Sequence, residues 1–500
     1  MFHIPKLVSA FLALTDSLTP PTSKSRGDEL WRQDPSDPSD ELHELFTSVH
    51  ARLRCVHRTL RGCGRGNVFA SVAVLVLLTR LVARFHAAVA KHRELNLLVR
   101  FATKRSTLGK LQELHRVIDL LFRLLELTGH LEMTKWSHEW EPQCRRMYAA
   151  FAERVKKPQL AVQGLPDAKV AEIMAIMKFE IVYHENESTA DQYLLLRNTF
   201  NALVRSSKVK VSKVPAFYIP SVDVEFGLPH EAIEGTSLSC VVTRSVCDQA
   251  ARLVVQYLSA DDRYSEQLFL GATEIWHGFQ HPYVMKMVGG SHVGSEHFVV
   301  WEDVAAHGNF IHCFTNGRCD HELHRRHLWR MFLQVARGLH YIHRQGQTHG
   351  SLKCSQIVVA EDKTPKICQF ELSEDSRAGA LDRWKSPESN LDPDLKPSKA
   401  GDVYAFGLCI IEAFTRAIPY EALEDDDVMI QFEEGRCYPR PEDMRDDEWD
   451  VVRRFVTHNP NDRPTMAQGI DMVEELAWKE AKEEEEAAVY GSAHTSGDKP

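Results

Sequence analysis

The polar residues that could carry out chemistry gather in two short segments of the second half of the chain. Residues 348–359, THGSLKCSQIVV, place Ser351 two positions after His349, and a serine beside a histidine can act as a nucleophile with its base. Residues 321–327, HELHRRH, place three histidines at helical steps but lack the H-E-x-x-H spacing of a zinc site. These histidines favour a solvated helix face, and we expect no metal site there.

The segment around Ser351 is the first of five that occur in a fixed order. It is followed by PKICQFELS at 365–373, RWKSPES at 383–389, GDVYAFGLCIIEAFTRAIPY at 401–420 and NPNDRP at 459–464. The series resembles the catalytic loop, the D-F-G segment, the A-P-E segment, the central C-lobe helix and the late arginine motif of protein kinases. The residues within these segments are most similar to those of the tyrosine-kinase-like group of serine/threonine kinases. Within such a loop, a degenerate kinase motif explains the serine and histidine better than a nucleophile pair.

The resemblance implies that the residues needed for phosphoryl transfer have been replaced. Ser351 stands where the family has its catalytic aspartate, and Gln356 stands for the metal-binding asparagine. Gln369 replaces the aspartate that holds magnesium, so the site lacks its main negative ligand. His349 and Lys353 are retained. We therefore expect no magnesium and no intact catalytic residue.

The nucleotide pocket implied by the resemblance is equally altered. Gln256 falls at the phosphate-pairing lysine and Ala272 at its partner glutamate, so both ends of that ion pair are absent. Trp301 falls at the gatekeeper position, before the hinge residue Glu302, where its indole would fill the adenine back pocket. The three glycines of the phosphate loop are replaced by Glu234, Thr236 and Ser239. We expect no bound cofactor, with ATP binding without magnesium as the weaker alternative.

The scaffolding residues of the family are present. Glu388 and Arg463 match the two positions that form a buried ion pair in the C-lobe, and Asp402 matches the residue that holds the catalytic loop. Gly350 replaces the arginine that clamps a phosphorylated activation loop in many kinases. The residues for phosphoryl transfer are replaced, whereas those that stabilise the fold are kept. This pattern is typical of a fold retained as a binding surface.

The elements that must position these residues divide the chain into four parts. Residues 1–40 are expected to form a flexible leader. Apolar residues then recur at three- and four-residue steps, which predicts an all-α helical bundle over residues 41–208, interrupted at GCGRG. Residues 209–478 make the α+β kinase-like domain, with an N-lobe at about 209–303 and a C-lobe at about 304–478. Residues 479–500 form an acidic, flexible tail.

Charge separates the two halves of the chain. Residues 1–210 contain 31 Lys+Arg and 22 Asp+Glu, a net of +9, and the totals of 60 and 70 leave a net of −19 for the remainder. Thirteen basic residues and one acid lie between His50 and Lys110, a local field that attracts anionic partners. Three roles remain open for this basic region. It can be a solvated arginine-rich surface, it can dock on the acidic half of the chain, or it can bind an anionic membrane. Nucleic acid is disfavoured as a partner.

Three features of the sequence bear on the cellular compartment of the protein. Eleven cysteines without a C-x-x-C pair indicate reduced thiols of the cytosol. The apolar run Val68 to Leu78 is shorter than the ~20 residues of a membrane-spanning helix, which favours a buried core helix. Asp16 interrupts the apolar N-terminus, which argues against a signal peptide. We expect a cytoplasmic protein.

These observations predict a signalling protein that is a catalytically dead pseudokinase and works as a scaffold or allosteric regulator with protein partners. One alternative is a weakly active ATP-dependent serine/threonine kinase. Another is a membrane-engaging helical-bundle effector controlled by its pseudokinase domain, because the arrangement is similar to the mixed-lineage-kinase-domain-like executioner of necroptosis.

Overall fold

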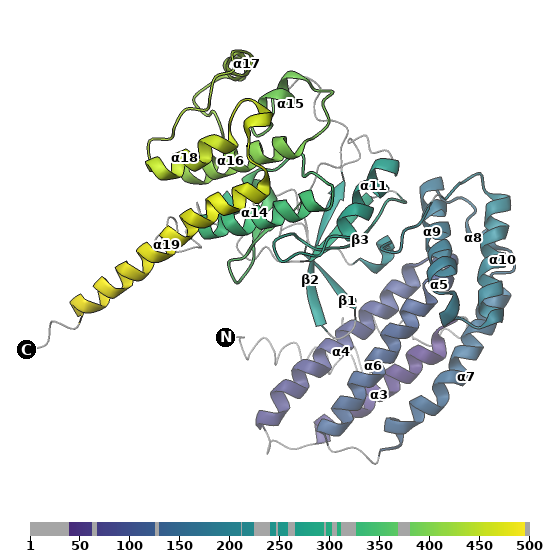
Figure 1. Ribbon diagram of the computed structural model, residues 1–500. Helices are drawn as coiled ribbons and strands as arrows, with labels where there is room; N and C mark the ends of the chain where they lie inside the picture. The colour runs from purple at the N-terminus through teal and green to yellow at the C-terminus, as the bar shows by residue number, and fades with distance from the viewer. Residues whose placement is uncertain are drawn as a thin grey trace, which may run out of the picture. The chain divides into compact units, whose positions relative to one another are not determined.

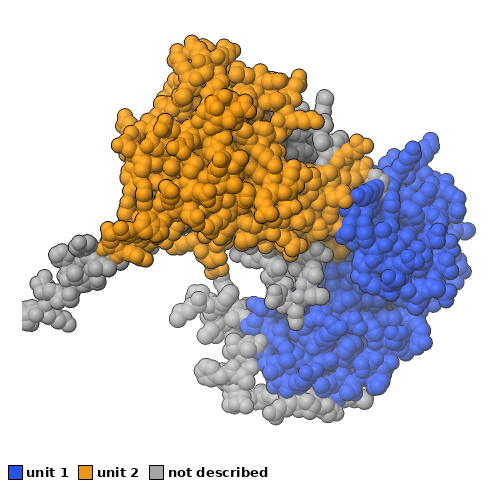
Figure 2. All heavy atoms as spheres, viewed as in Figure 1, with its two compact units in different colours: residues 1–216 blue, residues 217–500 orange. Residues whose placement is uncertain are grey.

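The structure is a computed structural model, and it describes residues 40–62, 68–125, 130–211, 213–224, 241–246, 249–258, 266–294, 297–302, 308–311, 327–368 and 381–495. The chain consists of two compact units, Met1–Ala216 and Phe217–Pro500 (Figure 2). The division falls later than the expected residue 208. Hydrogen bonds from Lys178 to the carbonyl of Val211 and from Tyr183 to that of Val214 explain why, because they attach this segment to the first unit.

The described part of the first unit is helical (Figure 1). Its long helices are α3 (His43–Gly62), α4 (Val68–Glu94), α6 (Lys104–Leu124), α7 (Leu131–Arg154), α9 (Asp167–Tyr183) and α10 (Ala190–Ser206). The shorter ones are α5 (Leu97–Ala102), α8 (Pro158–Ala161) and the 3-10 turn η1 (Glu185–Glu187). Helix α3 packs against α4, α6 and α7. Helix α3 ends at Gly62, the first residue of the GCGRG segment, and the rest of that segment lies outside the described residues.

Apolar residues at helical spacing build the core of this unit. Leu45, Val49 and Leu53 of α3 are at most 1% exposed, and Leu114 and Ile118 of α6 are also buried. Leu78 of α4 is fully buried. Among the described residues no helix is both long enough and apolar enough to cross a membrane.

One buried arginine ties three helices of the first unit together. Arg52 of α3 is 1% exposed and donates hydrogen bonds to the carbonyl of Glu132 at 2.9 Å and to Nδ1 of His115 at 2.9 Å. It also pairs with the carboxylate of Asp119. A buried charge is tolerated only when it is paired and hydrogen-bonded in this way.

The second unit begins with a small lobe built on a sheet. Strands β1 (Val241–Val246), β2 (Gln249–Leu258), β4 (His297–Glu302) and β3 (Met287–Ser291) form an antiparallel sheet in that spatial order. Helix α11 (Glu266–His277) contacts β3. The small turn η2 (Ser221–Asp223) precedes the sheet. Gly289 allows residues 217–219 to pair beside β3, since a Cβ there would lie only 2.3 Å from the carbonyl oxygen of Phe217.

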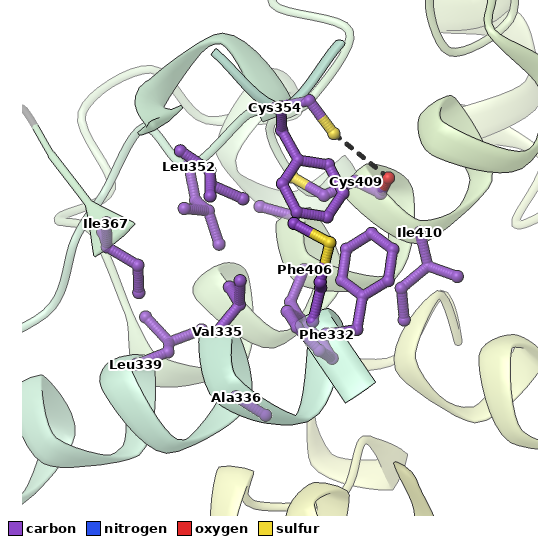
Figure 3. Close-up of a cluster of buried hydrophobic side chains, with 14 of the residues drawn as sticks. Phe332, Val335, Ala336, Leu339, Leu352, Cys354, Ile367, Phe406, Cys409 and Ile410 are labelled. Atoms are coloured by element: carbon purple, nitrogen blue, oxygen red, sulfur yellow. Dashed lines mark hydrogen bonds between the residues drawn. The ribbon is translucent and has the colours of Figure 1, made fainter. Parts of the chain in front are cut away.

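The larger lobe is helical. It contains α14 (Leu328–Arg344), η4 (Cys354–Gln356), the hairpin β5 (Ile357–Val359) and β6 (Pro365–Ile367), and α15 (Pro387–Leu391), followed by α16 (Lys399–Thr415), α17 (Asp425–Glu433), α18 (Asp446–Phe455), η5 (Pro460–Asp462) and α19 (Met466–Thr495). Helix α16 is apolar on nearly all sides and lies in the core (Figure 3). Burial on every face is the environment that such a sequence requires.

The end of the chain differs from the expected flexible tail, because α19 continues as a helix to Thr495. Its buried Glu480 accepts hydrogen bonds from the backbone N–H groups of Trp329 and Arg330, at 3.0 and 3.1 Å. These are unpaired donors in the first turn of α14, so Glu480 caps that helix from a distant part of the sequence. Glu484 adds an ion pair with Arg330.

Candidate functional site

The loop between α14 and β5 contains most of the predicted site residues, and Asp402 fixes its backbone. The carboxylate of Asp402, 2% exposed at the start of α16, accepts hydrogen bonds from the N–H groups of His349 and Gly350, both at 2.8 Å. Nε2 of His343 lies 2.8 Å from the same carboxylate. Gly350 has a φ of 83°, a conformation that favours glycine. The loop is therefore held by a side chain far away in the sequence.

The side chains of Ser351 and Gln356 face each other without an anionic group between them. Ser351 is buried, and Nε2 of Gln356 lies 3.5 Å from its hydroxyl oxygen. A proton acceptor and a magnesium ligand are required at these two positions for phosphoryl transfer. A hydroxyl and an amide supply neither a base nor a negative charge.

His349 is engaged with backbone groups rather than with the serine hydroxyl. Its Nδ1 accepts a hydrogen bond from the backbone N–H of Ser351 at 3.4 Å, and its Nε2 donates to the carbonyl of Cys368 at 3.3 Å. Burial lowers the pKa of His349, so the neutral ring is favoured. With both nitrogens occupied, the imidazole is not placed to activate the Ser351 hydroxyl.

Lys353 turns toward an aromatic ring. Its ammonium lies 5.4 Å from the ring centroid of Trp384, a cation–π distance. Trp384 in turn donates its indole N–H to the carboxylate of Glu412 at 2.7 Å. Burial raises the pKa of Glu412, and the nearby Lys353 charge acts against that shift. The retained lysine thus belongs to a structural cluster that the motif comparison did not reveal.

Two buried tryptophans pack together at the predicted gatekeeper position. Trp301 at the end of β4 is 3% exposed and stands edge-on to Trp276 of α11, with ring centroids 5.4 Å apart and planes at 90°. The indole N–H of Trp276 donates to the carbonyl of Met285 at 3.0 Å, which fixes its orientation. Nothing in the sequence motifs singles out Trp276. Its position four residues after Ala272 on one helix face was the available signal.

The remaining pocket positions lie on neighbouring elements. Gln256 lies in β2, where its backbone is paired with Val299 of β4, and Ala272 lies on α11. Glu302 at the end of β4 accepts a hydrogen bond from Nζ of Lys366 at 2.7 Å, so its carboxylate links the sheet to β6. Four predicted positions fall outside the described residues: Glu234, Thr236, Ser239 and Gln369.

The predicted scaffolding pair is assembled. Arg463 donates to both oxygens of Glu388, each at 2.7 Å, and to the carbonyl of Ala400 at 3.0 Å. Its guanidinium also lies 4.8 Å from the ring centroid of Tyr404. Burial alone would raise the pKa of Glu388, but the hydrogen bonds and charge of Arg463 outweigh it and lower that pKa.

A cavity of about 700 Å³ opens beside the loop. Ser351, Trp384, Asn390, Asp394 and Pro397 are among the residues that line it. Its walls come from the loop itself, from α15 and the segments on either side of it, and from the first turns of α16 and α17. The cavity mixes hydroxyl, amide and carboxylate groups with apolar side chains.

Two groups of side chains in the described part of the chain bring metal-type ligand atoms within 4.8 Å of one another. In the first, Cys354 Sγ donates to the carbonyl of Cys409 at 3.2 Å, as Figure 3 shows, while Glu412 accepts from Trp384. The second consists of Asp40, Glu41 and His92, and two arginines already pair with Glu41. Both groups have protein partners that a cation would have to displace, so neither favours a metal.

A lobe built on an antiparallel sheet, a helical lobe and an aspartate-anchored loop together form the arrangement of a protein-kinase fold. Residues 235–473 match the family model described as protein tyrosine and serine/threonine kinase. The chain therefore contains a protein-kinase domain preceded by a helical unit, and the predicted fold class is confirmed.

Individual relatives support the same assignment. A protein of Dictyostelium discoideum named as a probable serine/threonine-protein kinase is 27% identical over 281 residues, covering 55% of this chain and 20% of its own. Mitogen-activated protein kinase kinase kinase 9 of Arabidopsis thaliana is 26% identical over 49% of this chain and 31% of its own. Inactive tyrosine-protein kinase 7 of Mus musculus is 25% identical over 43% of this chain and 22% of its own. The chain thus spans a fifth to about a third of the length of these relatives.

Proposed function

We propose that the protein is a pseudokinase of the tyrosine-kinase-like group that acts as a scaffold or allosteric regulator in signalling. The observation that carries the proposal is the contact between Ser351 and Gln356, because it brings two neutral side chains together where a base and a metal ligand are needed. Loss of a general base alone costs about 10²–10⁴ in rate. Loss of the metal ligands removes the electrostatic stabilisation as well.

The nucleotide pocket gives independent support. Trp301, at the predicted gatekeeper position, packs edge-on against Trp276, and we propose that the two indoles fill the adenine back pocket. Gln256 brings no cation to the phosphates. A nucleotide would therefore meet a filled back pocket and no compensating positive charge at this position, so we propose that the resting protein carries neither ATP nor magnesium.

The retained architecture explains why such a domain would persist. The carboxylate of Asp402 and the Glu388–Arg463 pair hold the loop and the larger lobe in place without contributing to chemistry. We propose that the rigid surface around the cavity serves to recognise a protein partner. One of the relatives is itself named an inactive kinase.

The test is a thermal-shift titration of the full chain with ATP, with and without magnesium. A ligand that binds only the folded state raises the melting temperature by mass action, so we expect a shift below about 1 °C at millimolar ATP. The matched variant carries Gln256→Lys, Ser351→Asp and Gln369→Asp, which return the cation, the base and the metal ligand. A magnesium-dependent rise of several degrees in the unmodified protein would favour the weakly active kinase instead.

A second candidate function rests on the surface of the helical unit. Leu120 and Leu124 of α6 are 45% and 55% exposed, and the exposed Arg116 and Arg123 lie on the same helix face. An apolar stripe flanked by arginines is the pattern of an interfacial helix on anionic lipid. In liposome flotation, Arg116→Glu with Arg123→Glu should abolish binding to phosphatidylserine vesicles, whereas Arg197→Glu on α10 should not. Equal flotation of both variants would remove this candidate.

A further inference from the structure

A cysteine and a histidine meet on the surface of the helical unit. Cys55 lies in the second half of α3 and is partly exposed, and His130 is the exposed residue that precedes α7. The sulfur of Cys55 lies 3.4 Å from Nε2 of His130 and 3.7 Å from its Nδ1. Sulfur at this distance from a ring nitrogen is within hydrogen-bond reach.

The hydrogen bonds of His130 determine which nitrogen carries the proton. Nδ1 accepts a hydrogen bond from the backbone N–H of Glu132 at 3.2 Å, as the N-cap of α7. In a neutral imidazole the nitrogen that accepts has no proton, so the proton is on Nε2. Nε2 is also the nitrogen nearest to sulfur. The ring therefore offers an N–H donor to Cys55, and this donor stabilises a thiolate more than a thiol.

One further feature, the N-terminus of α7, places positive charge near the sulfur, and Arg52, which is paired with Asp119, lies close by. Helix α7 has 24 residues and begins next to His130, so the positive end of its dipole faces the same region. Arg52 lies one turn before Cys55 on α3, and the two side chains interact electrostatically. The acids facing this arginine are Asp119 and Glu132. Cationic groups and helix N-termini are the surroundings that activate thiols.

The other thiols in the described residues lie in different surroundings. Cys354, Cys368 and Cys409 are fully buried and Cys144 is nearly so, and burial raises the pKa of Cys144 to about 11 and that of Cys368 to about 12. Cys437 is exposed. It offers an internal comparison, because it is at least as accessible as Cys55 but does not lie beside the N-terminus of a long helix.

We propose that Cys55 is a reactive thiol and a site of reversible oxidation by hydroperoxides. The thiol first loses its proton to solvent, and the thiolate then attacks one peroxide oxygen. The S–O bond forms as the O–O bond breaks, and the leaving oxygen takes up a proton as an alcohol or as water. Sulfur is oxidised by two electrons to sulfenic acid, and the peroxide is reduced by two. His130 is a positioning residue whose Nε2–H stabilises the attacking thiolate.

The experiment treats the full chain with hydrogen peroxide, traps sulfenic acid with dimedone and measures each cysteine-containing peptide by mass spectrometry. A parallel pulse with iodoacetamide at neutral pH gives alkylation rates. We expect Cys55 to react about tenfold faster than Cys437 in both assays, because the fraction of thiolate sets the rate. Cys55→Ser should remove the modified peptide and leave the labelling of Cys437 unchanged.

The decisive variant is His130→Asn. Asparagine is a good N-cap, so α7 keeps its capped first turn while the imidazole N–H is removed. The reactivity of Cys55 should then fall toward that of Cys437, with an unchanged melting temperature. Equal rates for the two cysteines in the unmodified protein would overturn the proposal, as would a His130→Asn variant that folds normally and still reacts at the full rate. Neither result would bear on the pseudokinase proposal.

Discussion

Single polar side chains in the kinase domain do the work of several backbone contacts. Asp402 accepts hydrogen bonds from two consecutive N–H groups of the loop and also contacts His343. One carboxylate therefore fixes the backbone path of the loop between α14 and β5. Arg463 likewise reaches Glu388 and the carbonyls of Ala400 and His458. Neither residue performs a chemical step, and their role is to preserve the shape of the lobe.

Removal of Arg463 should destabilise the kinase domain strongly. Arg463→Met leaves Glu388 and three backbone carbonyls without their donor, and loss of one partner of such a pair costs about 3 kcal/mol. Urea unfolding monitored by tryptophan fluorescence measures the loss. The double variant Glu388→Gln, Arg463→Met should recover part of it, because no uncompensated carboxylate remains. If Arg463→Met lowered the unfolding free energy by less than about 0.5 kcal/mol, as a surface ion pair would, the pair would not be a major stabilising contact of the domain.

The same pair predicts a pH dependence. The pKa of Glu388 is lower in the folded protein than its ordinary value of 4.5, so the folded state binds fewer protons there than the unfolded state. Its contribution to stability is fully present above pH 4.5 and is lost as the pH falls through the lowered pKa. The difference in unfolding free energy between the unmodified protein and Glu388→Gln should shrink in that window. A difference that stays constant from about pH 7 to about pH 3 would rule out this origin.

At the scale of elements, the sequence predicted the helices and helix ends that depend on the local spacing of residues. The apolar steps of α3 and α6 predicted helices whose Leu53 and Ile118 are buried. The breaking segment GCGRG predicted the end of α3. Motif spacing predicted the partners of Asp402 and Arg463, because a known fold supplies the long-range contacts that spacing alone cannot.

Contacts that depend on distant residues were not predictable. The Trp276–Trp301 pair and the Lys353–Trp384–Glu412 cluster join elements whose distance is set by tertiary packing. Glu480 lies in the predicted acidic tail, and only the fold reveals that it caps α14. The Cys55–His130 contact has the same origin, since 75 residues separate its partners.

Helix α10 offers a local test at this scale. The Thr189 side chain accepts from the N–H of Gln192 at 3.4 Å while the Gln192 side chain accepts from the N–H of Thr189 at 3.1 Å, a capping box. Thr189→Ala should cost about 1 kcal/mol in urea unfolding of the helical unit. Thr189→Ser keeps the hydroxyl and should cost much less. Identical unfolding of the two variants would show that the box adds nothing.

At the scale of the whole molecule, the described cores belong to separate units. Leu53 is buried among helices of the first unit, whereas Phe406 is fully buried in the cluster of the larger kinase lobe. A Leu→Ala or Phe→Ala change in a core costs about 3–5 kcal/mol through lost transfer energy and a residual cavity. Because each cavity forms inside one unit, the loss should be felt locally.

Hydrogen-exchange mass spectrometry can distinguish local from global destabilisation, because it reports opening segment by segment. Leu53→Ala should accelerate exchange in peptides from α3, α6 and α7 and leave α14 and α16 unchanged, whereas Phe406→Ala should do the reverse. The exposed Leu160→Ala serves as the control, since a residue 62% exposed creates no cavity. If either core variant accelerated exchange equally in both units, the units would unfold as one cooperative body.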